Sequence, residues 1–303
     1  MPEKPHPKIL NETEAAVMMA EHYQPQLDLL SEFRKYSSNL GPRAYESSPK
    51  MLPDLILCYG LAMQLTSMLD AVDILMRAGA VHASFAQIRI AFEVSLQIQW
   101  MLQKNLNERA VYYYVGEVRR QRIWGLRAQA KTPEYNQFIK DLGFASYPGF
   151  EQEGASHAKQ ADAILALPEY ASADAAFDAY KKKTKRPYEP AWYKVLGVSS
   201  VAAMASAIGR RAEYAIFYSK GSEVVHSSTY KDHFKFGPKG ATVTPVRNVR
   251  EAHIAFENIF STALQAFRAI LEFYRPDELP AFAQTFTVEW RDAYRSIKRL
   301  KLV

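Results

Sequence analysis

The feature that most constrains the fold is one long seam of mostly apolar residues near the C-terminal end of the chain. It repeats in steps of four and three residues, and its members are Val249, His253, Phe256, Phe260, Ala263, Phe267, Ile270 and Tyr274. This spacing puts all of them along one side of a long α-helix, which Pro276 ends. A helix with such a seam must bury it against other elements. The seam therefore predicts a mainly α fold, a single multi-helix bundle.

Other stretches with helical spacing supply the partners of this helix. We predict helices over 11–38 with a kink at Pro25, and over Leu52–Arg77, Ala83–Lys104, Glu108–Ala130, Ser199–Ser227 and Val288–Leu302. Strand signals are scarce. The turn residues at 237–240, followed by 241–244, indicate either a small hairpin or an ordered loop.

We expect these helices to form one domain over residues 1–303. In this interpretation 1–49 is an N-terminal helix, 50–130 and 191–303 form the bundle core, and 131–190 is an irregular helical insertion or lid. A separate domain over 131–190 is the alternative. One domain is favoured because the flanking helices need each other to bury their apolar faces.

Composition excludes several classes of protein. The chain has 303 residues, of which 48% are hydrophobic and 23% charged, so it is neither disordered nor a disulfide scaffold. Its one cysteine, Cys58, lies in an apolar run and predicts a buried thiol in a reducing compartment. The N-terminus has no apolar signal-peptide core, and the most apolar stretch, 54–70, is shorter than a bilayer span. We therefore predict a cytoplasmic protein with no membrane partner.

Common nucleotide-binding, zinc-protease and serine-hydrolase motifs are absent from the sequence, so no cofactor is predicted. Glu223-x-x-His226 has the spacing of a di-iron ligand pair, but a second such pair is missing. We accordingly predict no metal site.

The most informative polar residues fall into two helical sets. Arg89 and Glu93 are four residues apart in a strongly apolar helix, where a buried charge needs a partner. Tyr218, Ser222 and His226 follow one another at steps of four, which places them on one stripe about 12 Å long. A polar stripe inside a helical bundle also needs partners, and Arg89 with Glu93 would supply them.

These two sets occur in a recognisable order. Arg89-x-x-x-Glu93 is followed by a helix with Arg109-x-x-x-Tyr113, a loop around Trp192, and then Tyr218-x-x-x-Ser222-x-x-x-His226. Over roughly residues 50–235 this order resembles the all-helical bacterial family of unknown function numbered 5677. That family is in turn distantly similar to HEPN domains, many of which are metal-independent ribonucleases of toxin and phage-defence systems. The resemblance implies a helical bundle and a bacterial origin, and the HEPN likeness alone implies a defence setting and a homodimer.

HEPN ribonucleases use an Arg-x(4–6)-His motif, and this chain has one literal match. The match runs from Arg77 to His82, and Gly79 between them would let the chain turn. Arg77 and His82 are therefore an alternative catalytic motif.

Two interpretations of the main set stay open. In the first, Arg89, Glu93 and His226 are catalytic residues of a ribonuclease-like enzyme or RNA-binding protein. His226 would move a proton, Arg89 would hold a phosphate and Glu93 would orient them. Tyr218, Ser222 and Tyr113 would bind the substrate. In the second, the same set is a structural polar network in a non-enzymatic ligand-binding or protein-interaction scaffold.

Charge and aromatic runs bear on the RNA interpretation. The chain has 38 Lys and Arg against 32 Asp and Glu, a net charge of +6. Basic residues gather at 119–131, 181–186 and 295–301, and would form a nucleic-acid groove if they converge. Otherwise they are solvated surfaces. Three consecutive tyrosines, 112–114, cannot all face the core, so at least one ring points away from it. That ring could stack on a base, and partial burial or an interface is the commoner alternative.

Overall fold

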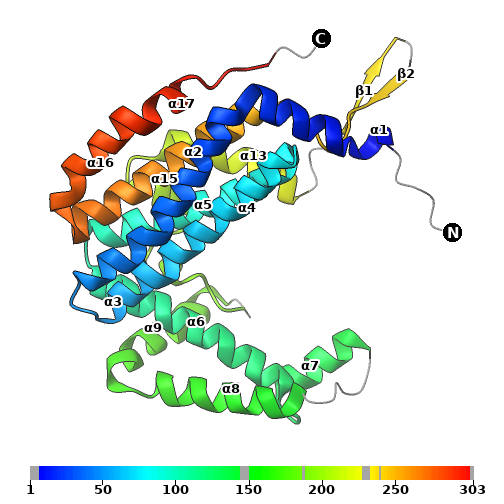
Figure 1. The fold of residues 1–303 in the computed structure, drawn as a ribbon. Helices are drawn as coiled ribbons and strands as arrows, with labels where there is room; N and C mark the ends of the chain where they lie inside the picture. Colours follow the sequence, from blue (N-terminus) through cyan, green and yellow to red (C-terminus); the bar gives the residue numbers. More distant parts are fainter. Residues whose placement is uncertain (1–6, 144–149, 186–187, 227–232, 239, 301–303) are drawn as a thin grey trace. The chain divides into compact units, whose positions relative to one another are not determined.

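A computed structural model describes residues 7–143, 150–185, 188–226, 233–238 and 240–300. This part of the chain is mainly α-helical, as predicted, with one small sheet (Figure 1). The chain divides into two compact units. The first consists of 1–104 with 201–303, and the second of 105–200.

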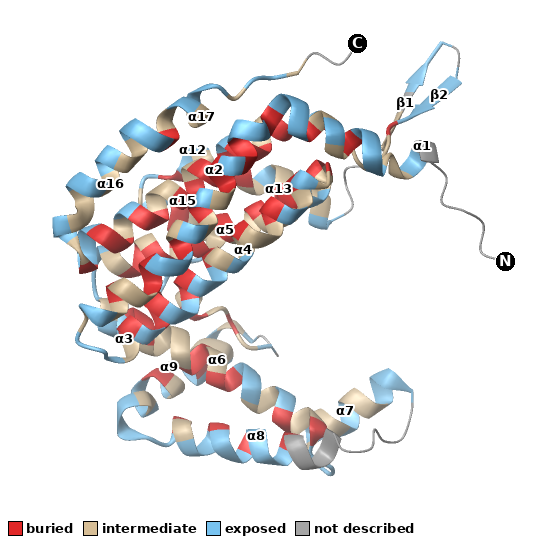
Figure 2. Cartoon of the chain, viewed as in Figure 1, coloured by how far each residue is buried: buried red, intermediate tan, exposed pale blue. Residues whose placement is uncertain are grey.

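Four long helices form the core of the first unit. They are α2 (Glu12–Glu46), α4 (Ala62–Arg77), α5 (Val81–Gln103) and α15 (Ala252–Tyr274). Their buried residues line the faces that they turn toward one another (Figure 2). The predicted seam of α15 is confirmed as core, with Phe256, Phe260 and Phe267 fully buried. Burial of each such ring contributes about 1.5–3 kcal/mol to folding.

Aromatic contacts join α15 to α2. The ring of Phe33 in α2 lies 5.1 Å from the ring of Phe260 and 5.8 Å from that of Phe267. The predicted kink in α2 is present, because Tyr23 leaves helical geometry at φ −132°, two residues before Pro25. A proline ring crowds the preceding turn, which accounts for the distortion there. The helix continues to Glu46, beyond the predicted end at 38.

The predicted helix over Leu52–Arg77 is continuous but contains a wider turn. It consists of α3 (Leu52–Leu55), the π-helical segment η1 (Ile56–Leu61) and α4. Asp54 is buried and accepts hydrogen bonds from the Met51 N–H and the Tyr274 hydroxyl, both at 2.9 Å. This carboxylate therefore fastens the start of the helix to the end of α15.

The same stretch, Leu52–Arg77, is long and apolar enough to cross a membrane, and 44% of its most apolar window is buried inside the protein. Helices in the cores of water-soluble proteins have the same properties, so one such helix is weak support for a membrane span. The cytoplasmic location stays a prediction.

Shorter elements follow in the first unit, where one helix over Ser199–Ser227 was expected. The chain instead forms α11 (Val201–Ala207), α12 (Arg211–Glu213), the π-helical η2 (Tyr214–Tyr218) and α13 (Ser219–Val225). Gly209 breaks the helix because its φ of +76° is left-handed.

Outside that segment, the first unit also holds the small sheet and the C-terminal helices. The expected hairpin is present as the antiparallel strands β1 (Phe234–Gly237) and β2 (Gly240–Val243). The remaining elements are α1 (Pro7–Leu10), η3 (Pro276–Glu278), α16 (Leu279–Thr285), η4 (Phe286–Trp290) and α17 (Arg291–Arg295). The C-terminal helix thus begins and ends earlier than the predicted Val288–Leu302.

The second unit is a set of helices around α6. Its elements are α6 (Leu106–Ala128), α7 (Pro133–Leu142), α8 (Phe150–Leu165), α9 (Pro168–Thr184) and α10 (Trp192–Val195). The predicted bundle core includes the α6 helix and the predicted insertion begins at 131; in the structure α6 lies within the unit 105–200. Small residues explain the packing. A Cβ on Gly125 would lie 2.5 Å from the backbone nitrogen of Ala158, so α6 and α8 meet at a distance that only glycine allows.

Candidate functional site

Arg89, Glu93 and Tyr218 form one polar cluster in the first unit. Arg89 Nε donates to Glu93 Oε1 at 3.1 Å along α5, and Arg89 Nη2 donates to the Tyr218 hydroxyl at 2.7 Å. The guanidinium carbon also lies 4.3 Å from the centroid of the Tyr218 ring. The Arg89 side chain is 17% exposed and that of Glu93 28%. The cluster therefore joins η2 to α5 at a largely covered position.

Gly221 lets this cluster form. A Cβ at Gly221 would lie 2.5 Å from both the Phe85 carbonyl oxygen and the Arg89 Cβ, so α13 rests directly on α5. Beside it, the ring of Phe217 packs edge-on against Phe92 at 5.5 Å. The close approach leaves no room for a ligand between α13 and α5 at this point.

Burial sets the protonation of the cluster. It raises the pKa of the Glu93 carboxyl, and the neighbouring Arg89 only partly offsets the rise. Burial, followed by the nearby Glu93 carboxylate, also raises the pKa of Tyr218. Tyr218 is therefore a neutral phenol that accepts a hydrogen bond from Arg89, and it is not poised as a base.

The other two members of the predicted stripe lie apart from the cluster. Ser222 is half-buried, and its carbonyl accepts the His226 N–H at 3.0 Å. His226 is exposed because α13 ends at Val225. Within the described residues, no hydrogen bond or ion pair joins the His226 side chain to Arg89 or Glu93. The structure thus brings together Arg89, Glu93 and Tyr218 and leaves His226 at the surface.

Arg77 and His82, the alternative catalytic pair, contact different residues. Arg77 donates to Asp73 at 2.8 Å, to the Leu27 carbonyl at 2.8 Å and to Ser31 at 2.9 Å, which fastens α4 to α2. Gly79 makes the expected turn with φ +68°. The His82 ring, however, packs edge-on against His233 at 5.0 Å.

Tyr113 belongs to the second unit, where all three consecutive tyrosines have ring partners. Tyr113 packs edge-on against Trp192 at 5.5 Å, Tyr112 stacks on Phe177 at 6.1 Å, and the tilted ring of Tyr114 lies 5.2 Å from that of Tyr170. Burial raises the pKa of Tyr113, with a smaller contribution from Glu117. We therefore treat Tyr113 as a packing residue of this unit.

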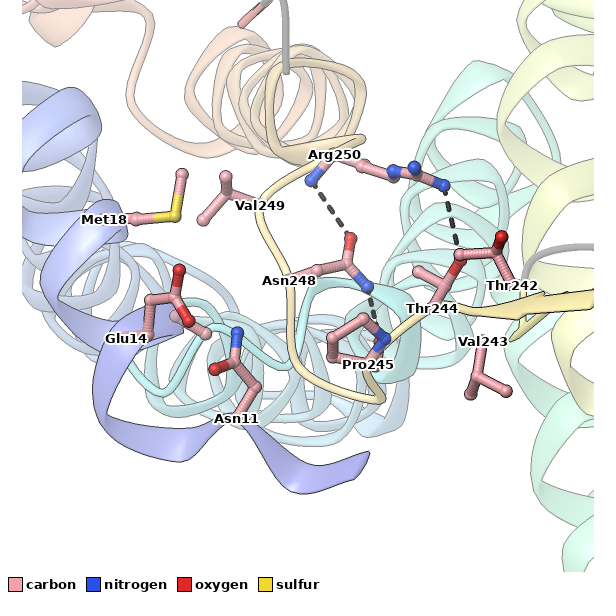
Figure 3. Close-up of a pocket in the computed structure, with 11 residues that line it drawn as sticks. Asn11, Glu14, Met18, Thr242, Val243, Thr244, Pro245, Asn248, Val249 and Arg250 are labelled. Carbon is pink, nitrogen blue, oxygen red and sulfur yellow. Dashed lines mark hydrogen bonds between the residues drawn. The ribbon is translucent and has the colours of Figure 1, made fainter. Parts of the chain in front are cut away.

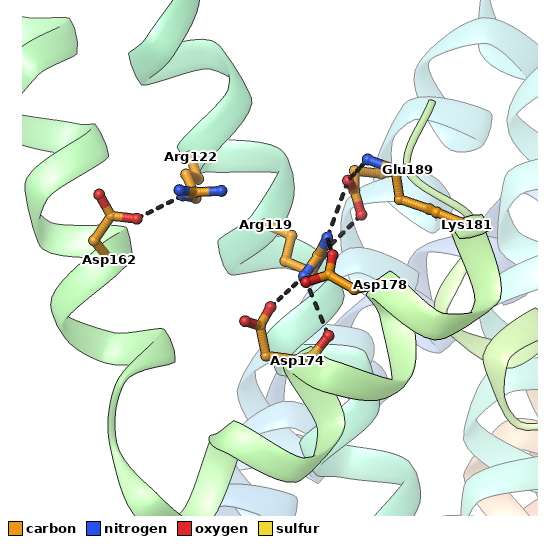
Figure 4. A network of polar contacts seen from close by, with 7 residues as sticks. All are labelled: Arg119, Arg122, Asp162, Asp174, Asp178, Lys181 and Glu189. Carbon is orange, nitrogen blue, oxygen red and sulfur yellow. Dashed lines mark hydrogen bonds and ion pairs between the residues drawn. The ribbon is translucent and has the colours of Figure 1, made fainter. Parts of the chain in front are cut away.

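Three arginines of α6 are paired with acidic side chains: Arg119, Arg120 and Arg122. Figure 4 shows the pairs of Arg119 and Arg122. Arg119 is the centre of a cluster that we call the Arg119 clasp, formed with Asp174, Asp178, Lys181 and Glu189. Nearby, Arg122 bonds Asp162 at 2.5 Å and Arg120 bonds Glu117. Arg119 joins α6 to α9 and Arg122 joins α6 to α8, whereas the Arg120–Glu117 pair lies within α6. Three positive charges of the predicted basic run are thus paired with carboxylates.

Hydrogen bonds between the side chains of the Arg119 clasp stabilise their charged forms. Burial opposes the charge of Arg119, but the hydrogen bonds that it donates to Glu189, Asp178 and Asp174 outweigh this effect and raise the pKa of Arg119. Burial also acts to raise the pKa of Glu189, and the bonds from Arg119 and Lys181 reverse the shift, so that this pKa is lowered. Sequence reasoning took Arg119 for a surface residue. Its position directly after the apolar Val118, on the buried side of the helix, was the available signal.

The remaining basic residues are partly outside the described chain. Lys182, Lys183 and Lys185 are exposed, whereas Arg186 and Lys301 lie outside the described residues. The basic residues at 295–301 belong to the first unit, and those at 119–131 and 181–186 belong to the second. A shared nucleic-acid groove therefore stays a prediction.

Three cavities lie elsewhere. One of about 270 Å³ opens between the start of α2 and the chain after β2 (Figure 3), where Asn248 bonds the Pro245 carbonyl and the Arg250 N–H. One of about 470 Å³ lies between α2 and α4 beside Cys58. The third, of about 450 Å³, lies between α6 and α8. None of the three is lined by the Arg89 cluster or by His226.

We call the third cavity the α6–α8 groove. Its lining residues are Tyr114, Glu117, Val118, Gln121 and Trp124 from α6, with His157, Gln160, Ala161 and Ile164 from α8. Sequence reasoning did not select this groove, because it exists only where two helices distant in sequence meet. Within the described residues, no group of three or more His, Cys, Asp or Glu side chains is arranged to hold a metal ion.

Comparison with known proteins gives one match. The model of a family of unknown function, DUF5677, matches residues 55–239. That range includes the Arg89 cluster, His226 and the whole second unit. No curated protein and no solved structure matches the chain.

Proposed function

The chain belongs to the DUF5677 family of unknown function, and from this premise we propose that it is a non-enzymatic binding protein whose ligand site is the α6–α8 groove. In this proposal the Arg89 cluster is a structural network. It holds η2 and α13 on α5, and the second unit provides the binding surface.

The observation that carries the proposal is the separation of Arg89 from His226. A general base must come within about 2.6–3.2 Å of the proton that it moves, in the same site as the group that holds the phosphate. Arg89 instead bonds Glu93 and Tyr218, while His226 lies exposed beyond the end of α13. The HEPN-like interpretation also needs an Arg and a His together, and Arg77 is bonded to α2 while His82 packs on His233.

The α6–α8 groove has the character of a ligand site. Its lining combines the apolar Val118, Ala161 and Ile164 with aromatic and amide side chains. Ligand sites combine such apolar walls with a few placed polar groups and have volumes of about 300–1,000 Å³. The groove volume of about 450 Å³ lies within that range.

The enzyme alternative is tested with wild type, Arg89→Ala and His226→Ala. Each is incubated with a mixed RNA pool without added metal, and its thermal melting is measured. We expect no cleavage by any of them, a lowered Tm for Arg89→Ala, and a Tm unchanged for His226→Ala. Cleavage by wild type that His226→Ala abolishes at an unchanged Tm would show an enzyme and overturn the proposal.

The binding role is tested through Trp124, which is 56% exposed, whereas Trp100, Trp192 and Trp290 are at most 4% exposed. Quenching of tryptophan fluorescence therefore reports on the groove. We expect at least one member of a panel of nucleotides, flavin mononucleotide, indole and phenol to shield Trp124 from acrylamide. The Trp124→Phe variant should lose the signal. A panel without any binder by calorimetry would contradict the proposal.

A further inference from the structure

We infer that the α6–α8 groove binds an unstacked purine base, an inference that rests on the proposed binding function. The base is recognised by stacking on aromatic rings and by hydrogen bonds to a side-chain amide. A free nucleotide and a single-stranded RNA both present this chemistry, and the experiment below separates the two sources.

Two aromatic rings stand at either end of the α6 side of the groove. Tyr114 and Trp124 are ten residues apart, so their positions along the helix differ by about 15 Å. Both line the same groove, and each contacts another aromatic ring. Tyr114 rests on Tyr170 at 5.2 Å, and Trp124 meets Phe138 edge-on at 6.2 Å.

Trp124 is the better platform because most of its surface is open to solvent. At 56% exposure it leaves a large apolar area uncovered, although it lies in a groove and not at a chain end. Arg127 lies 4.7 Å from the centroid of its ring system and supports one side. Stacking of a base on such a ring contributes about 1–3 kcal/mol to binding.

Two amide side chains line the groove together with the rings. Gln121 lies one helical turn before Trp124, and Gln160 faces the groove from α8; both are exposed. Neither amide is used in a side-chain hydrogen bond among the described residues. A glutamine amide offers a donor and an acceptor side by side, which is the pattern that the N6/N7 edge of adenine requires. A purine also has a larger ring system than cytosine or uracil and stacks over a larger area on Trp124, so the groove favours a purine base.

The charges around the groove suit an attached phosphate. Glu117 is already paired with Arg120, so its carboxylate is neutralised. Lys159 is exposed next to Gln160 on α8, and Arg127 lies beside Trp124. Residues 105–200 contain 14 Lys and Arg against 11 Asp and Glu, a net charge of +3. A nucleotide phosphate would meet cations at the rim of the groove.

The test titrates the whole protein with AMP, CMP, hexa-adenylate RNA and hexa-uridylate RNA, using calorimetry and Trp124 fluorescence. We expect AMP to bind more tightly than CMP. Trp124→Ala and Gln121→Ala should each weaken AMP binding by about 5- to 150-fold, which corresponds to 1–3 kcal/mol. Trp124→Ala should also reduce the preference for AMP over CMP, because the larger purine loses more stacking area than the pyrimidine. Tyr188→Ala and Gln129→Ala are matched controls, because both residues are exposed and lie outside the groove lining.

The oligonucleotides identify the source of the base. If a single strand is the ligand, hexa-adenylate engages both rings, binds more tightly than AMP, and weakens as salt rises. Equal affinities for AMP and hexa-adenylate identify the free nucleotide. Both results support a purine site.

Other outcomes overturn the inference in distinguishable ways. Binding of AMP that survives both Trp124→Ala and Gln121→Ala places the site elsewhere. Binding of indole or flavin without any purine would contradict the purine inference and leave the proposed binding function standing. Absence of every binder in the panel would contradict both.

Discussion

Arg89 contacts Tyr218 in two ways at once: its Nη2 donates to the phenol oxygen at 2.7 Å, and its guanidinium carbon lies 4.3 Å from the ring centroid. The two residues are 129 positions apart in the chain. A single side chain on α5 therefore holds the π-helical segment η2 by both a hydrogen bond and a cation–π contact.

The hydrogen bond can be removed without the ring contact. Tyr218→Phe keeps the ring but leaves the largely buried Arg89 Nη2 without its acceptor, so we expect a loss of about 1–2 kcal/mol in the free energy of unfolding. Tyr214 stacks on Tyr218 at 4.5 Å, and Tyr214→Phe is the control. Chemical denaturation compares the two, and equal stabilities would show that the bond to Arg89 contributes nothing.

Gly221→Ala tests the close packing of α13 on α5. In an isolated helix, alanine is more favourable than glycine by about 1 kcal/mol. Here the added Cβ would lie 2.5 Å from the Phe85 carbonyl oxygen, so we expect the variant to lose about 1–3 kcal/mol instead. Ser222→Ala, at the next position, should change stability by less than that. A Gly221→Ala protein more stable than wild type would contradict the packing described here.

The Arg119 clasp predicts acid sensitivity. The pKa of Glu189 is lowered in the folded protein, because the bonds from Arg119 and Lys181 outweigh the effect of burial. Its ionised form therefore stabilises the fold above the ordinary glutamate pKa of about 4.3, and this contribution disappears as the pH falls through the lowered value. Glu189→Gln should be less stable at pH 7 and should lose less stability on acidification. Glu169→Gln, at an exposed glutamate of α9, should follow wild type when melting is measured from pH 7 to 3.

The Cys58 thiol should be inert in the folded protein. Burial, with a smaller effect from Asp54, raises its pKa to about 12. Since the thiolate is the reactive form, a thiol reagent at pH 8 should label Cys58 only after denaturation. An added surface thiol, Ser219→Cys, should react at once in the same assay. Rapid labelling of native wild type would show that Cys58 is accessible.

The long helices could be predicted because their periodicity is local. The α15 seam identified buried rings correctly, and the hairpin at 234–243 is one of the two alternatives that the turn residues at 237–240 indicated. The wider turns η1 and η2 could not be predicted, because nothing in the residues at 56–61 or 214–218 distinguishes a π-helical turn from an α-helical one. Gly209 marks the break in the 199–227 segment, yet glycine is tolerated in many helices.

The candidate site was predictable only in part. Arg89 and Glu93 pair as their spacing of four predicts, and Tyr218 meets them from a distant segment. His226 does not join them because α13 ends one residue earlier, and helix ends are poorly defined by sequence. The sequence around Gln121 and Trp124 does not mark them as site residues, because the groove that they line forms only where α8 packs against α6.

The division of the first unit between 1–104 and 201–303 has a consequence for synthesis on the ribosome. At about 5–20 residues per second, α15 follows the completed 105–200 segment by several seconds. During that time Phe33 and the other core residues of α2 lack the rings of Phe260 and Phe267 that cover them in the finished fold. The nascent chain thus passes through a period of exposed apolar surface, in which chaperone binding would compete with aggregation.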